Sequence, residues 1–331
     1  MSRIAVIGAG AWGTALSIVL ARGGRHQVNM WAYEREVCDS IQQTRINEPF
    51  LPKFPIPEQV SVTNSLSAAL RSAEIVLTVM PSDHARRLFQ QMRDPLSGVN
   101  ALVSATKGIE NESDKRMTEI AVEVAGVSRV AALSGPSFAK EVARGDPTAV
   151  TVASVDTELA ALIQREFSDP MFRVYTSDDV VGVELGGALK NVVAIAAGIV
   201  EGLGLGHNSA AALITRGLAE ITRLAVACGA RRETLSGLSG MGDLVLTCTG
   251  ALSRNRTVGV ELGRGRKLPE IMAGMHGMVA EGVHTTDAAL GLARRHGIEM
   301  PISQQVHFIL HEQKSPQDAI RELMNRPGKE E

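Results

Sequence analysis

Aromatic side chains are scarce in this chain of 331 residues: Phe, Trp and Tyr together make up 3% of it. The core must therefore be filled by aliphatic side chains, and 44% of the residues are apolar, an ordinary share for a globular protein. Basic clusters interleaved with aromatics are also missing. Because the formal net charge is −2 as well, we expect no nucleic-acid partner. The length indicates two domains, or one large α/β domain with an appendage.

Cysteine is equally rare. Cys38, Cys228 and Cys248 are far apart and odd in number, which fits a reducing compartment better than a disulfide framework. The N-terminus runs directly into a predicted strand rather than through a signal peptide. The longest apolar stretch, 185–200, has 16 residues, includes Lys190 and falls short of a membrane span. We therefore expect a soluble, cytoplasmic protein that does not insert into membranes.

Short aliphatic runs recur along the first half of the chain, each followed by a turn and a helical pattern. Because strands buried on both faces need not alternate with polar residues, these runs predict a Rossmann-like, doubly wound, mainly parallel α/β sheet. Helices are expected over 14–22, 85–92 and 157–167, and a loop over the proline-rich segment 49–57. The expected strands are 4–7, 28–31, 60–63, 75–79, 102–105, 130–133, 148–153 and 172–176.

The strand pattern stops near residue 180. Helical patterns follow it, separated by glycine-rich joints at 202–206, 237–242 and 263–265. We therefore predict an α/β domain over 1–180 and an all-α domain over 181–331.

Three glycines, Gly8, Gly10 and Gly13, follow the first expected strand and precede the first expected helix. Gly8 permits a tight turn, Gly10 lets the backbone approach a pyrophosphate, and Gly13 allows the helix to pack closely on the strand. The N–H groups at the helix start complete an anion site. Because strand, loop and helix follow in this order, the motif predicts a dinucleotide site rather than an incidental glycine turn.

The end of the second expected strand bears on the choice of dinucleotide. An acid there favours NAD, whereas an arginine admits the 2′-phosphate of NADP. The chain offers both Glu34 and Arg35, so the preference for NAD or NADP stays open, and both are also interpretable as solvated loop charges. Lys107 follows another expected strand at the edge where open parallel sheets bind ligands, although alone it would be a plain surface lysine.

Lys190 is the one ionisable side chain in the apolar stretch 185–200. A helix that is apolar on nearly all faces is buried, and an unpaired ammonium there costs several kcal/mol. Two explanations remain open. The lysine forms a structural ion pair, or burial tunes it for proton transfer as a general acid and base. Glycines in this stretch, such as Gly186 and Gly198, are explained by close helix packing.

Two later segments carry polar side chains suited to a site. Asp243 follows a glycine turn, so it either caps a helix or orients Lys190 and a substrate hydroxyl. The run from Ser253 to Asn255 puts a hydroxyl, a guanidinium and an amide together, a set that suits a phosphate, with a basic helix start as the alternative. We expect no metal, because we identify no metal-ligand spacing among the cysteines and histidines.

Taken together, these segments closely resemble the bacterial NAD(P)-dependent glycerol-3-phosphate dehydrogenases. The most specific are Gly-Gly-Ala-x-Lys-Asn, which ends at Asn191, and Gly-Asp-Leu-x-x-Thr-Cys, which begins at Gly242. The matching segments cover nearly the whole chain in the family's order: 8–16, 105–108, 134–141, 183–191, 242–249 and 253–256.

The resemblance implies a role for each matching residue. Lys190 would be the catalytic proton donor and acceptor, with Asp243 and Thr247 beside it. Tyr33 is a departure, because members often carry Arg or His there, which aids 2′-phosphate binding. Implied cofactor contacts are Gly8, Gly10, Ala11, Trp12, Gly13, Tyr33, Glu34, Lys107, Ala139, Arg254, Val279 and Glu281. Implied substrate contacts are Lys107, Gly135, Ser137, Lys190, Asp243, Ser253, Arg254 and Asn255.

The implied activity is interconversion of dihydroxyacetone phosphate and glycerol 3-phosphate with NAD or NADP, which supplies glycerol 3-phosphate for phospholipid synthesis. Domain 1–180 would then bind the dinucleotide, and 181–331 would carry the substrate and catalytic residues. The resemblance also implies a homodimer. The alternatives are a β-hydroxy acid dehydrogenase of the same architecture and a non-catalytic dinucleotide sensor.

Overall fold

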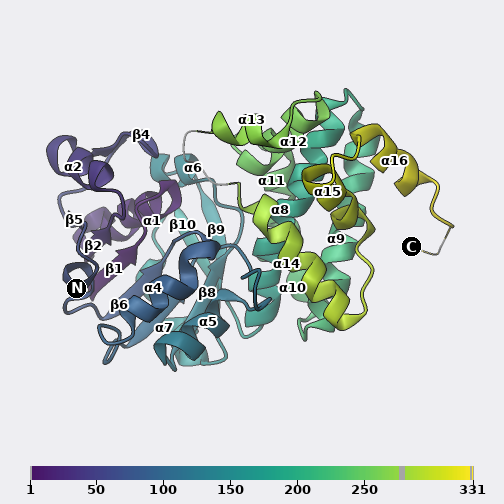
Figure 1. Cartoon of the computed structure of the whole chain (residues 1–331). Helices are drawn as coiled ribbons and strands as arrows, with labels where there is room; N and C mark the ends of the chain where they lie inside the picture. Colours follow the sequence, from purple (N-terminus) through teal and green to yellow (C-terminus); the bar gives the residue numbers. More distant parts are fainter. Residues whose placement is uncertain (1, 276–279, 329, 331) are drawn as a thin grey trace. The chain divides into compact units, whose positions relative to one another are not determined.

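A computed structural model describes residues 2–275, 280–328 and 330 (Figure 1). The chain forms two compact units. The first comprises the residues up to Gly108 and Lys115–Glu184, and the second comprises Ile109–Asp114 and the residues from Leu185 onward. The predicted division lay between 180 and 181, whereas the structure divides the chain between 184 and 185 and assigns 109–114 to the second unit.

The first unit is built on an eight-stranded sheet in the order β10-β9-β8-β7-β6-β1-β2-β5. Every neighbouring pair is parallel except β8 and β9, so the predicted Rossmann-like, mainly parallel sheet is confirmed. All eight predicted runs are strands of this sheet. They are β1 (Ser2–Ile7), β2 (His26–Trp31), β5 (Val60–Thr63), β6 (Ile75–Thr78), β7 (Ala101–Ser104), β8 (Val130–Ser134), β9 (Thr148–Ala153) and β10 (Phe172–Ser177).

Helices cover both faces of this sheet, which explains why the central strands β6 and β7 are buried at every residue (Figure 1). In β1, Ile4 and Val6 pack into the core on one face, whereas Ala5 and Ile7 pack into the core on the other. The helices are α1 (Ala11–Ala21), α2 (Arg35–Thr44), α3 (Leu66–Leu70), α4 (Ala85–Met92), α5 (Met117–Ala125), α6 (Ala139–Arg144) and α7 (Thr157–Phe167).

The proline-rich segment 49–57 differs from its prediction as a loop. Within it, β4 (Leu51–Pro55) pairs antiparallel with β3 (Ile46–Asn47) in a separate two-stranded sheet. Proline has no backbone N–H to donate to a neighbouring strand. It is tolerated here because both strands of a two-stranded sheet are edge strands, with one side that pairs with no other strand. The prediction of a loop over 49–57 was therefore wrong, because proline ends helices and central strands but is compatible with an edge strand.

Within the described residues, the second unit contains helices but no strand, as predicted. Its central helix is α8 (Val180–Gly202), whose first residues belong to the first unit. The other elements are α9 (His207–Ala227), α10 (Arg232–Leu235), the π-helical turn η3 (Leu238–Gly242), α11 (Asp243–Thr249), α12 (Arg254–Gly263), α13 (Leu268–Ala273), α14 (Glu281–His296), α15 (Pro301–His311) and α16 (Pro316–Met324).

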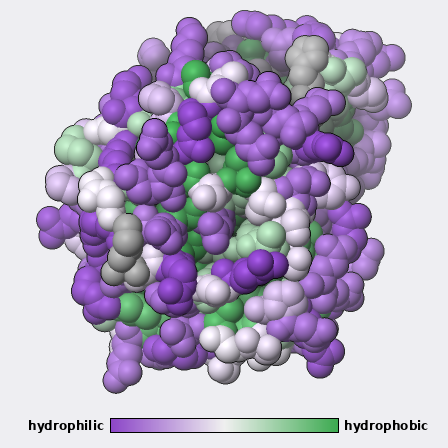
Figure 2. All heavy atoms as spheres, turned by 90° about the vertical axis from the view of Figure 1, so that its left-hand side faces the viewer, coloured by the Kyte–Doolittle hydropathy of each residue, from purple (hydrophilic) through white to green (hydrophobic). Residues whose placement is uncertain are grey.

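Helix α8 is longer than the apolar stretch that predicts it. Its 23 residues are long and apolar enough to cross a membrane, so the prediction that it falls short was wrong. Its most apolar window is nevertheless 100% buried inside the protein, as in the core helix of a soluble protein. Polar and charged residues cover most of the molecular face in Figure 2, with apolar residues visible mainly where that face is recessed.

Glycines bring the backbones of α8 and α12 into direct contact. A Cβ atom on Gly198 would lie 2.0 Å from the carbonyl oxygen of Arg256, and one on Gly259 would lie 2.0 Å from that of Ile195. Gly186 packs against η3 in the same way, since a Cβ atom on it would lie 2.6 Å from the Ser239 carbonyl oxygen. The predicted packing role of Gly186 and Gly198 is therefore confirmed.

A buried carboxylate joins α9 to α15. Glu220 is 2% exposed, and its two oxygens accept hydrogen bonds from the backbone N–H groups of Ile302 and Ser303, at 2.6 and 3.3 Å. Burial raises the pKa of Glu220 to about 7, although these hydrogen bonds oppose the shift.

Candidate active site

The glycine loop between β1 and α1 has an open side. Gly8 adopts φ 125°, which favours glycine, and its Cβ would lie 2.7 Å from the Val79 carbonyl oxygen. A Cβ on Gly13 would lie 1.9 Å from the Gly8 carbonyl oxygen, so the helix packs directly on the loop. Among the described residues, no atom would lie within 4 Å of a Cβ on Gly10. The loop is thus tight everywhere except at the glycine that the motif assigns to the pyrophosphate.

The start of α1 is suited to an anion. Its first turn, which includes Ala11 and Trp12, contains no acidic residue, so the helix itself places no carboxylate at the positive end of its dipole. The indole N–H of Trp12 is buried and has no hydrogen-bond partner among the described residues. Together with the open side of Gly10, these features fit a dinucleotide phosphate.

The carboxyl end of β2 carries three exposed side chains. Tyr33 is 62% exposed and lies edge-on to the Trp31 ring, with the ring centroids 5.9 Å apart. Glu34 is the N-cap residue of α2, and Arg35 lies 3.9 Å from the carboxylate of Asp39 in a solvent-exposed pair. The charges of Glu34 and Arg35 thus lie in solvent at the position where dinucleotide folds contact the ribose.

Three predicted substrate residues meet beyond the ends of β7 and β8. The Lys107 Nζ donates hydrogen bonds to the Gly135 carbonyl oxygen at 2.9 Å and to the Ser137 hydroxyl at 3.2 Å. The Ser137 hydroxyl donates to the same carbonyl at 2.9 Å. Gly135 adopts φ 140° and packs against Val150, where a Cβ would lie 2.9 Å from its Cα. Lys107 is therefore held in place by the loop that follows β8.

Ala139, a predicted cofactor contact, begins α6 and is half-buried.

In the second unit, Lys190 of α8 forms a buried cluster with two residues of α11. Its Nζ donates to the Asp243 carboxylate and, at 3.0 Å, to the Thr247 hydroxyl. The Thr247 hydroxyl donates in turn to the Asp243 carbonyl oxygen at 2.7 Å. Only 6% of the Lys190 side chain and 1% of the Asp243 side chain are exposed. The three predicted catalytic residues therefore lie together.

This geometry bears on the two roles predicted for Asp243. The N-cap of α11 is Gly242, and Asp243 is the first residue of the helix, with its carboxylate bound by Lys190. The orienting role is thus favoured over the capping one. The neighbouring Cys248 is buried, and burial raises the pKa of its thiol to about 12 despite the positive charge of Lys190. Cys248 is therefore a neutral thiol and not a nucleophile.

The predicted phosphate-binding residues occupy different environments at the start of α12. Ser253 is the N-cap residue, and its hydroxyl accepts a hydrogen bond from the Arg256 backbone N–H at 3.2 Å. Arg254 is exposed. Asn255 is buried, where its amide donates to the Asn191 side-chain oxygen and accepts from the Gly282 N–H, both at 2.9 Å.

Asn191 was not predicted as a site residue, although it follows Lys190 directly. Through Asn255 it links α8 and α12 to the start of α14. A second polar residue in an otherwise apolar helix was the available signal. The predicted cofactor contact Glu281 is the first residue of α14 and is half-buried. The other one there, Val279, lies outside the described residues.

The basis for expecting no metal was wrong. His307 and His311 are four residues apart on α15, a spacing that places two imidazoles on the same face of a helix. Asp287 of α14 lies beside them. None of these three residues belongs to the predicted site.

A Rossmann-like unit with an open glycine loop, joined in one chain to a helical unit with a buried lysine, defines an NAD(P)-dependent oxidoreductase. Residues 3–160 match the family model described as the N-terminus of NAD-dependent glycerol-3-phosphate dehydrogenase, and residues 179–321 match the model of its C-terminus. The chain belongs to the NAD-dependent glycerol-3-phosphate dehydrogenase family.

Individual relatives agree over the full length. The chain is 68% identical to a glycerol-3-phosphate dehydrogenase [NAD(P)+] of Koribacter versatilis, with 99% of this chain and 98% of the relative covered. It is 57% identical to the protein of the same name from Acidobacterium capsulatum, with both chains covered at 100%. The crystal structure of glycerol-3-phosphate dehydrogenase from Coxiella burnetii superposes with a TM-score of 0.95 at 42% identity and covers 98% of this chain and 99% of that one.

Proposed function

We propose that this protein is an NAD(P)-dependent glycerol-3-phosphate dehydrogenase that interconverts dihydroxyacetone phosphate and sn-glycerol 3-phosphate, with Lys190 as its acid–base residue. The observation that carries the proposal is the buried cluster of Lys190, Asp243 and Thr247 in a chain of this family. A bound nicotinamide supplies or accepts the hydride. The protein's own residues hold the substrate and move the proton.

Lys190 is suited to that proton transfer. The Asp243 carboxylate favours the charged ammonium and fixes its direction, so Nζ can stabilise and then protonate a ketone oxygen as negative charge develops on it. In the reverse direction, neutral Nζ accepts the proton of the alcohol. The Thr247 hydroxyl holds Nζ from a second side at 3.0 Å, which limits its freedom to turn away.

Charged side chains in each unit suit an anionic substrate. In the second unit, the exposed guanidinium of Arg254 is available to bind a phosphate with two parallel hydrogen bonds. The Ser253 hydroxyl is bound by the Arg256 backbone N–H, and the Asn255 amide is bound by Asn191. These two residues would therefore position the start of α12 as well as line the phosphate site. In the first unit, Lys107 supplies a positive charge held by Gly135 and Ser137.

The geometry of the glycine loop supports the proposed roles of the pyrophosphate residues. Gly8, Gly10, Ala11, Trp12 and Gly13 would hold the pyrophosphate at the start of α1, where Gly10 leaves room for it. Tyr33 and Glu34 would meet the ribose, with Ala139, Arg254, Val279 and Glu281 as further contacts.

We also propose that the enzyme is cytoplasmic, acts as a homodimer and supplies glycerol 3-phosphate for phospholipid synthesis. The three free cysteines and the buried position of α8 support a reducing compartment without membrane insertion. Light scattering coupled to gel filtration tests the dimer directly, because a mass of one chain would contradict it.

The test of the activity is oxidation of NADH and of NADPH by the purified protein, with and without dihydroxyacetone phosphate. Oxidation that requires this substrate supports the proposal, and the ratio of the two rates measures cofactor preference. Oxidation with a β-keto acid instead of the triose phosphate would contradict it. Lys190→Ala should lose at least about 100-fold in turnover, whereas Lys267→Ala, at an exposed lysine of the same unit, should not.

A further inference from the structure

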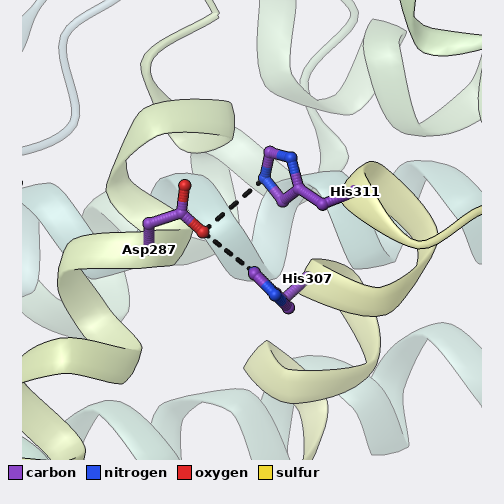
Figure 3. Close-up of side chains that lie close together, drawn as sticks. All are labelled: Asp287, His307 and His311. Carbon is purple, nitrogen blue, oxygen red and sulfur yellow. Dashed lines mark hydrogen bonds and ion pairs between the residues drawn. The ribbon is translucent and has the colours of Figure 1, made fainter.

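Asp287, His307 and His311 form a compact cluster on α14 and α15, apart from the residues assigned to the reaction (Figure 3). The Nδ1 atom of His307 lies 2.9 Å from the Asp287 Oδ1, and the Nε2 atom of His311 lies 3.6 Å from the same oxygen. The two imidazole centroids are 5.0 Å apart. One carboxylate oxygen and two ring nitrogens therefore converge from two helices.

These separations match the first shell of a metal ion. Ligands bound to tetrahedral zinc at about 2.0–2.1 Å lie about 3.3 Å from one another. The two measured distances, 2.9 and 3.6 Å, fall on either side of this value, and all three ligand atoms lie within 4.8 Å of one another. Two histidines and a carboxylate are also a recurrent ligand set for zinc.

The surroundings of the cluster favour a cation. The other ring nitrogen of His307, Nε2, lies 3.8 Å from the Glu312 carboxylate, so a metal on Nδ1 would have the outer carboxylate that orients metal-bound histidines. His311 is the last residue of α15, where the helix dipole is negative. With neutral imidazoles, the two carboxylates give the cluster a net negative charge that a divalent cation would offset.

The cluster is also accessible. The exposed fractions of the three side chains are 43% for Asp287, 29% for His307 and 34% for His311. A metal can enter from solvent, and water can complete its coordination. This exposure distinguishes the cluster from the buried Lys190 centre, which is built for proton transfer.

We propose that Asp287, His307 and His311 bind one divalent transition-metal ion of the zinc class, with Glu312 orienting His307. The metal ties α14 to α15 and so stabilises the second unit. It takes no part in the transfer of hydride or proton, and the proposal is independent of the reaction assigned above.

The first test is a titration of metal-free full-length protein with Zn²⁺ against a competing chromophoric chelator. The wild-type chain should bind one Zn²⁺, and the variant His307→Ala/His311→Ala should lose that site. His284→Ala/His296→Ala is the matched control, because it removes two exposed histidines from α14 and should bind as wild type does. Equal binding by wild type and by the His307/His311 variant, or no binding up to about 100 μM, would overturn the proposal.

Two further measurements distinguish this site from the cysteines and test Glu312. Co²⁺ in place of Zn²⁺ should give a visible spectrum without thiolate bands, and thiolate bands would assign the metal to cysteine instead. Glu312→Gln should weaken Zn²⁺ binding about 10-fold, and unchanged affinity would remove Glu312 from the site. Saturating Zn²⁺ should raise the melting temperature of wild type by a few degrees but leave that of the His307/His311 variant unchanged.

Discussion

Gly10, the N-cap residue of α1, and Gly13, in the first turn of that helix, should respond differently to the same substitution. Gly10→Ala adds a methyl group where no atom of the part of the chain that the structure describes lies within 4 Å. Losing a preferred N-cap residue costs about 1 kcal/mol, and the lower chain entropy of the unfolded variant returns about 0.4–1 kcal/mol. The free energy of unfolding should therefore change by less than about 0.5 kcal/mol.

Gly13→Ala instead places its methyl carbon 1.9 Å from the Gly8 carbonyl oxygen, where ordinary contact begins at 3.4 Å. The backbone must move by roughly 1.5 Å, since the obstructing atom is not on a flexible side chain. Overpacking of this kind costs about 3 kcal/mol, from which a gain in helix propensity of about 1 kcal/mol is subtracted. We expect a loss of about 2 kcal/mol in the free energy of unfolding.

Cofactor affinity should show the reverse order. The methyl group of Gly10→Ala occupies the space through which a pyrophosphate reaches the loop. Loss of one hydrogen bond to a charged group costs about 1.5–3 kcal/mol, so the Kd for NADH should rise about 10- to 100-fold. Urea unfolding and NADH fluorescence titrations measure the two quantities. A Gly10→Ala variant that is as unstable as Gly13→Ala, yet binds NADH as wild type does, would refute this account of the loop.

Three other predictions concern charged residues. Lys190→Met should lower the free energy of unfolding by about 3–5 kcal/mol because it leaves the Asp243 carboxylate buried and unpaired. In urea unfolding, Lys190→Met/Asp243→Leu should recover much of this loss, but it should not recover turnover. Recovered turnover would show that the pair is purely structural. In steady-state kinetics, Arg254→Ala should raise the KM for dihydroxyacetone phosphate at least about 10-fold, while its unfolding free energy stays within about 0.5 kcal/mol of wild type. An unchanged KM would show that Arg254 does not bind the phosphate. Folded Glu220 remains protonated up to about pH 7, whereas the unfolded residue ionises near pH 4.5, so its contribution to stability is lost as pH rises between these values. Over this range the unfolding free energy of Glu220→Gln should therefore fall less than that of wild type. Identical slopes of unfolding free energy against pH would contradict the raised pKa.

The sheet could be predicted because burial on both faces leaves a strong local signal. Each of the eight strands falls on a predicted run, and the helices α4 and α7 coincide with their predicted ranges. Strand direction leaves no such trace: β9 is as apolar as its neighbours, yet it runs antiparallel to β8. The same limit explains β3 and β4, whose pairing is not encoded in periodicity.

The site was predictable wherever one residue stood out against its neighbours. Lys190 is conspicuous in an apolar helix, and the loop glycines have a fixed spacing. That Nζ would meet Asp243, 53 residues further on, depended on the family resemblance rather than on local pattern. The bond from Asn255 to Asn191 and the approach of Asp287 to His307 are tertiary contacts. No spacing along the chain distinguishes such pairs from solvated polar residues.

The contact between α8 and α12 fixes the distance between these two helices of the second unit. Gly198 and Gly259 lie where the two backbones touch, so no side chain is available to absorb an error in spacing. Arg254 is on the same short helix as Gly259, and Lys190 is on the same helix as Gly198. A methyl group added at either glycine would therefore force the two backbones apart without touching Arg254 or Lys190. If these two residues act as proposed, two positions without a side chain help to set the distance between the phosphate-binding group and the proton donor.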